Sequence, residues 1–238
     1  MQEFLYSLLA MLSALIGTFL VLKFTDWSRK NSILLIGFAA GVMLSIAFFH
    51  LIPEAVESNS DSLVYIFYGF LFMYAVQQFL FFHPCHDERC HTHTHLGALS
   101  TFGLSMHSFF DGIIISIGFG VSGTIGVLTT FAIILHKIPD GITITGILLH
   151  EKTGIKKIIS FSALVALFTP VGTILGLTFF NYISREIMGI FLAFTAGTFI
   201  YLSASDLIPE THKASSKKAG CCLFIGVVLV AFVGHLLH

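Results

Sequence analysis

Two copies of a short motif join a histidine to an aspartate at helical spacing. His107 and Asp111 are four residues apart, His136 and Asp140 repeat the interval, and a glycine follows each aspartate. In an α-helix this spacing places both side chains on one face, one turn apart. Two imidazoles and two carboxylates suit a borderline divalent cation such as Zn²⁺, with Fe²⁺, Mn²⁺ or Cd²⁺ as alternatives. The alternative is a purely structural role, in which the histidines form hydrogen bonds between packed helices. The repetition of the motif argues against it.

The surroundings of both motifs are apolar. Hydrophobic residues make up 55% of the chain and charged residues only 11%, a balance that does not fit a water-soluble domain of this length. Runs long enough to cross a bilayer, at about 20 residues each, cover 4–22, 33–52, 63–82, 96–121, 125–149, 158–180, 187–208 and 221–237. We expect an all-α integral membrane protein of eight transmembrane helices, forming a single domain over residues 1–238.

The distribution of lysine and arginine predicts the orientation in the bilayer. With the N-terminus outside, the outer loops hold only Arg185. The cytoplasmic loops then hold Lys23, Arg29, Lys30, Arg89, Lys152, Lys156, Lys157, Lys213, Lys217 and Lys218. Both termini are therefore expected outside, in a plasma membrane or a bacterial inner membrane.

An internal repeat links the second and seventh spans. The sequence FAAG at 38–41 with HLIPE at 50–54 is echoed by FTAG at 194–197 with DLIPE at 206–210. Because these spans run in opposite directions, the echo predicts an inverted repeat of helices 1–3 and 6–8 around helices 4 and 5, a common transporter construction. The polar residues of the repeat are candidate entrance and exit ligands, with helix capping and loop solvation as the alternative: His50, Glu54, Asp206 and Glu210.

Lys137 lies beside His136 inside the fifth span, where a charge is costly unless it is paired. Three interpretations remain open. The amine is neutral through desolvation, or it is charged and paired with Asp111 or Asp140 to compensate charge without metal, or it snorkels toward a headgroup. A charged Lys137 would repel a second cation, which predicts one metal per site.

A loop at about 83–95, between the third and fourth spans, has the composition of a metal-binding segment. Its candidate ligands are His83, Cys85, His86, Cys90, His91, His93 and His95. Their spacing matches no closed zinc fold. We expect a cytoplasmic acceptor or sensor for arriving metal, with a merely solvated loop as the alternative.

These features together resemble the ZIP family of divalent metal transporters. The resemblance rests on HSFFDG at 107–112 and HKIPDG at 136–141, on the eight-span layout with outward termini, and on the His-rich loop. It covers nearly the whole chain. It implies transport into the cytoplasm through a site midway across the membrane, with these ligands: His107, Asp111, His136, Asp140 and, through a weak thioether contact, Met43.

The sequence also departs from that family. Many members carry Glu where this chain has Asp111 and Asp140, and some bind two metals through polar residues at the positions of Ser108 and Lys137. Aspartate shortens the reach by one methylene, and a protonated lysine cannot act as a ligand. The departures imply single-metal binding and altered selectivity.

The expected function is secondary, alternating-access transport of a divalent transition-metal cation, zinc first. The metal is the substrate, and neither an enzyme nor a cofactor is expected. We expect no direct use of ATP, because the sequence lacks a nucleotide-binding loop, and no nucleic-acid partner, because it lacks a basic face. An intramembrane zinc-dependent hydrolase and a metal sensor without flux are the alternatives. A homodimer is compatible with this architecture, although no residue argues for it.

Overall fold

The computed structural model describes residues 2–81, 96–179 and 184–235, and every regular element in this part of the chain is a helix. Eight of the described helical stretches are long and apolar enough to cross a membrane, which confirms the predicted number of spans. The α-helices are α1 (Gln2–Lys23), α2 (Thr25–Lys30), α3 (Ser32–Ile46), α4 (Ile52–Ser58), α5 (Leu63–Val76), α6 (Leu96–Val121), α7 (Gly123–His150), α8 (Ile155–Phe179), α9 (Arg185–Tyr201), α10 (Ile208–Lys213) and α11 (Lys217–His235).

Two helices extend beyond the predicted apolar runs at their basic ends. The sixth span begins at Ile155 rather than 158, and the eighth begins at Lys217 rather than 221. Lysines at these positions end an apolar window, but they do not end a helix, because straight-chain residues have good helix propensity.

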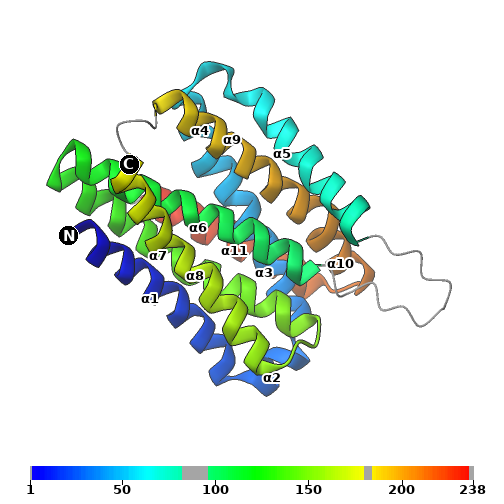
Figure 1. Ribbon diagram of the computed structural model, residues 1–238. Coiled ribbons are helices and arrows are strands. Elements are labelled where there is room, and N and C mark those ends of the chain that lie inside the picture. Colours follow the sequence, from blue (N-terminus) through cyan, green and yellow to red (C-terminus); the bar gives the residue numbers. More distant parts are fainter. Residues whose placement is uncertain (1, 82–95, 180–183, 236–238) are drawn as a thin grey trace.

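The helices run between two ends of an elongated bundle (Figure 1). At one end lie the starts of α1, α7 and α9 and the ends of α6 and α11; we call it the terminal end. At the other, the loop end, lie α2, α10, the end of α7 and the start of α6. The second span therefore runs toward the terminal end and the seventh runs away from it, as the predicted inverted repeat requires.

Both copies of the repeat contain a π-helical turn, Ala47–Leu51 between α3 and α4 and Leu202–Leu207 between α9 and α10. The N–H of Ile52 donates to the carbonyl of Ala47 and that of Ile208 to Ser203, five residues back. Prolines at 53 and 209 have no N–H for the carbonyl four residues earlier, so the helix widens there. His50 and Asp206 occupy equivalent places in the two turns.

The helices form two groups, each held together by close backbone contacts. The first group is α1, α6, α7 and α8, and the second is α3, α4, α5, α9, α10 and α11. Within the first group Gly141 lies against the carbonyl of Ala14, and within the second Gly41 lies against that of Leu223. Between the groups Gly146 faces the side chain of Leu35 instead. Glycines permit such close helix packing in membranes.

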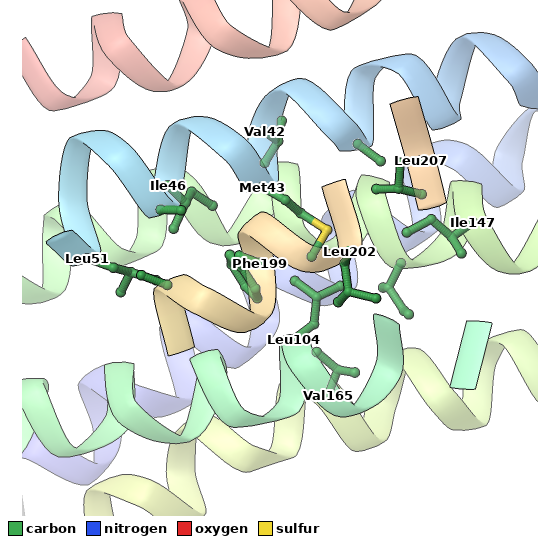
Figure 2. Close-up of a cluster of buried hydrophobic side chains, with 14 of the residues drawn as sticks. Val42, Met43, Ile46, Leu51, Leu104, Ile147, Val165, Phe199, Leu202 and Leu207 are labelled. Atoms are coloured by element: carbon green, nitrogen blue, oxygen red, sulfur yellow. The ribbon is translucent and has the colours of Figure 1, made fainter. Parts of the chain in front are cut away.

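An apolar cluster fills the interface between the groups (Figure 2). It runs from Leu51 at one side of the view to Ile147 and Leu207 at the other, and Met43 and Phe199 lie among its members. Met43 and Phe199 have no exposed surface. The cluster therefore separates the polar residues of the two π-turns.

Candidate metal site

Helices α6 and α7 bring the four motif residues together. One ligand atom from each of His107, Asp111, His136 and Asp140 can be chosen so that all four lie within 4.8 Å of one another, and all four residues are buried. Asp111 Oδ2 lies 3.3 Å from Nε2 of each histidine, and His107 Nε2 lies 3.7 Å from Asp140 Oδ2. The i, i+4 spacing and the crossing of two neighbouring helices thus converge on one point.

The glycine after each aspartate holds its helix against a neighbour in the same group. A methyl group on Gly112 would overlap the carbonyl oxygen of Thr169 in α8, and one on Gly141 would overlap that of Ala14 in α1. These contacts fix the rotation of α6 and α7 about their axes, so the motif faces meet rather than turning toward lipid.

The hydrogen bonding of the cluster is incomplete in a way that suits a cation. Both ring nitrogens of His107 and Oδ1 of Asp140 are buried without a hydrogen-bond partner among the described residues. Such atoms are costly unless something satisfies them. Metal–ligand distances of about 2.0–2.2 Å require only a modest contraction of this cluster around Zn²⁺.

Lys137 completes the cluster from the side away from solvent. Its side chain has no exposed surface, so the snorkelling interpretation is wrong. Nζ lies 2.6 Å from Asp111 Oδ2 and 3.0 Å from Asp140 Oδ2, and it donates to Ser108 Oγ at 2.9 Å. The side chain therefore pairs with both aspartates, as the charged interpretation expects.

A cavity of about 630 Å³ leads to the cluster from the terminal end. His107, Asp111 and His136 lie on its inner wall, and His50 and Glu54 lie along its side. The cavity lining also includes Glu57 and Arg185, two well-exposed residues whose side chains pair at 3.7 Å. The two candidate entrance residues are thus on the approach to the cluster.

The two candidate exit residues lie at the loop end, beyond the apolar cluster. Asp206 accepts a hydrogen bond from Gln77 at 3.2 Å. Glu210 pairs with His150 at 3.4 Å and with Lys213 at 3.2 Å. The contact between His150 and Glu210 joins the end of α7 to α10, and so connects the two helix groups at this end.

The remaining candidates are placed differently. Met43 is a member of the apolar cluster, and the ring of Phe199 in that cluster packs on His107 with 5.1 Å between centroids. The seven candidate ligands of the 83–95 loop lie outside the described residues, so their role stays a prediction.

Sequence reasoning missed the contacts at the end of α7. From the sequence, no role was assigned to His150 or Glu151. Their signal in the sequence was the presence of two adjacent ionisable residues at the end of an apolar span. His150 Nδ1 lies 3.1 Å from Ser32 Oγ, and Glu151 accepts the N–H of Gly97 at 2.8 Å. Burial raises the pKa of the Glu151 carboxyl to about 7, against the opposing effect of the N–H groups of Gly97 and Leu96.

Sequence comparisons relate this chain to known transporters. Residues 81–234 match the family model described as ZIP Zinc transporter. The chain is 31% identical over 232 residues to the zinc transporter ZupT of Chlorobium luteolum, covering 88% of this chain and 87% of the relative. It is 27% identical over 254 residues to ZupT of Chlorobium limicola, covering 95% of each. It is 33% identical over 148 residues to protein zntA of Dictyostelium discoideum, covering 59% of this chain and 29% of that protein. This chain, whose described residues form eight helices long and apolar enough to cross a membrane and a buried His/Asp cluster, belongs to the ZIP zinc transporter family, a family of metal transporters and not of enzymes.

Proposed function

We propose that this protein moves Zn²⁺ from the terminal end to the loop end of the bundle and into the cytoplasm, through His107, Asp111, His136 and Asp140. The observation that carries the proposal is the convergence of two imidazoles and two carboxylates on one buried point that a cavity reaches. The relatives named zinc transporter support zinc as the first choice. Iron, manganese and cadmium remain alternatives, because this donor set does not select sharply among them.

The direction of transport is supported by charge. Basic residues at the loop end exceed those at the terminal end, and cytoplasmic loops are enriched in such residues. The terminal end then faces outside, where the cavity with His50 and Glu54 receives the ion. Asp206 and Glu210 at the loop end serve its release.

Alternating access is supported by the division of the helices into two groups. Backbone contacts at glycines hold each group as a unit, whereas the groups meet through side chains such as Leu35 at Gly146. Movement of α1, α6, α7 and α8 against the rest would close the cavity and part the apolar cluster. The ion would then face Asp206 and Glu210.

A single metal ion occupies the site in this proposal. Nζ of Lys137 is within 3.0 Å of a carboxylate oxygen of each aspartate, so a second cation beside it would meet an ammonium group. Two ions bound per protein in the membrane site would contradict this stoichiometry.

The test is uptake into vesicles loaded with a metal-sensitive dye, with Zn²⁺, Fe²⁺, Mn²⁺ and Cd²⁺ offered separately. The variant His107→Ala/Asp111→Ala should lose saturable uptake. The matched control, Asp26→Ala/His212→Ala, removes the same residue types from exposed positions and should keep it.

Other outcomes separate the alternatives. Tight zinc binding without flux in the wild type would favour a metal sensor. Metal-dependent hydrolysis in detergent, where no gradient exists, would favour a hydrolase. Equal uptake by the double variant and the control would show that the ion does not pass through the cluster.

A further inference from the structure

Lys137 is among the largest fully buried side chains in the described part of the chain, and it lies within the proposed transport site. Its Nζ is surrounded by three oxygens, Asp111 Oδ2, Asp140 Oδ2 and Ser108 Oγ, at 2.6, 3.0 and 2.9 Å. An ammonium group has three N–H donors, whereas a neutral amine has two. The surroundings therefore match the charged form, with one acceptor for each proton.

The two carboxylate oxygens that hold the ammonium group also face the histidines of the cluster. Asp111 Oδ2 faces Nε2 of His107 and of His136, both at 3.3 Å, while it contacts Lys137. Asp140 Oδ2 likewise faces His107 and Lys137. A metal ion that uses Asp111 Oδ2 together with both histidines must displace the ammonium group from that oxygen, while Asp140 Oδ1, which has no hydrogen-bond partner among the described residues, is available to the ion.

The charge of the site shows what this exchange achieves. With neutral imidazoles, two carboxylates and one ammonium group leave a net charge of −1 without metal and +1 with one divalent ion. Without Lys137 the net charge of the site would be −2 when it is empty and 0 when it holds one divalent ion. Because the cost of burying charge in a low-dielectric region grows with its square, the empty site would then be about four times as costly to hold in the membrane.

We propose that Lys137 is a tethered counter-cation, which takes the place of the metal between Asp111 and Asp140 so that the empty carrier can return without a co-transported ion. The proposal rests on the proposed transport function. It assigns to Lys137 a role in the return of the empty carrier, and not in delivering metal to the site.

Two modes of transport distinguish this role. Net uptake of radiolabelled Zn²⁺ into zinc-free vesicles requires the empty carrier to return. Exchange between equal Zn²⁺ concentrations on both sides requires only the loaded carrier to cross. Lys137→Gln should keep exchange within a few-fold of the wild type and should lower the ratio of net uptake to exchange at least tenfold. Lys137→Gln/Asp140→Asn restores the charge of −1, so at saturating Zn²⁺ this ratio should return toward the wild-type value.

A second measurement uses the wild type alone, in case the variant does not fold. The loaded site carries +1, so an imposed membrane potential of either sign should slow exchange at equal Zn²⁺ concentrations. The proposal is overturned if exchange ignores voltage, if Lys137→Gln keeps the wild-type ratio, or if both modes fall together in a folded variant. Absence of zinc exchange in the wild type would instead refute the proposed function.

Discussion

Glu151 offers a direct test of the packing at the loop end. It follows α7 and accepts the N–H of Gly97, and so joins the ends of the two helices that carry the candidate ligands. Its carboxyl has a pKa of about 7, compared with 4.5 for an unperturbed glutamate. We predict that this residue makes the stability of the protein depend on pH.

The sign follows from proton binding. Between pH 4.5 and 7 the folded state holds a proton that the unfolded state has released. The free energy of unfolding therefore falls as pH rises through this window, and the stabilisation present below pH 4.5 is lost above about pH 7. Linkage gives a difference of about 2.5 kcal/mol between pH 5 and pH 8. Because the carboxyl is only half-buried, screening by solvent reduces the expectation to about 1–2 kcal/mol.

The assay compares melting temperatures of the wild type and Glu151→Gln in detergent at pH 5 and pH 8. Groups other than Glu151 act equally in both proteins, so they cancel in the difference. Relative to the wild type, the variant should gain about 3–6 °C between the two pH values. Glu186→Gln, at an exposed position, is the matched control and should show no such gain. A flat difference, or one of opposite sign, would refute the assignment of Glu151.

Two further predictions concern helix packing and the contacts at the loop end. Gly172→Ala should destabilise the protein by about 1–3 kcal/mol, because the added methyl group would overlap the carbonyl oxygen of Phe109. In the control Gly220→Ala the added methyl group meets free space, so this variant should be neutral or slightly stabilising in thermal melting. Glu210→Gln weakens the contact of Glu210 with His150, which connects the two helix groups at the loop end, so amide hydrogen exchange at the end of α10 should rise several-fold. Unchanged protection would show that this contact does not hold the loop end together.

The eight spans and the shared faces of the two motifs were predictable from sequence. Apolar runs of about 20 residues define membrane helices through bilayer thickness alone. The interval between His107 and Asp111 places both on one helical face through backbone geometry alone. The order of the spans likewise predicted opposite directions for the helices that carry His50 and Asp206, and the prolines that follow these residues were a further sequence signal for the π-turns.

Tertiary structure alone decided whether the two motif faces meet. The rotation of α6 and α7 depends on contacts far away in sequence, such as Gly112 with Thr169 and Gly141 with Ala14. The same packing turned Lys137 inward between two carboxylates, where its sequence position left three interpretations open. It also opened the cavity at the terminal end and paired His150 with Glu210 at the other. Spacing along a helix is a local property, whereas the facing of two helices depends on every surface packed around them.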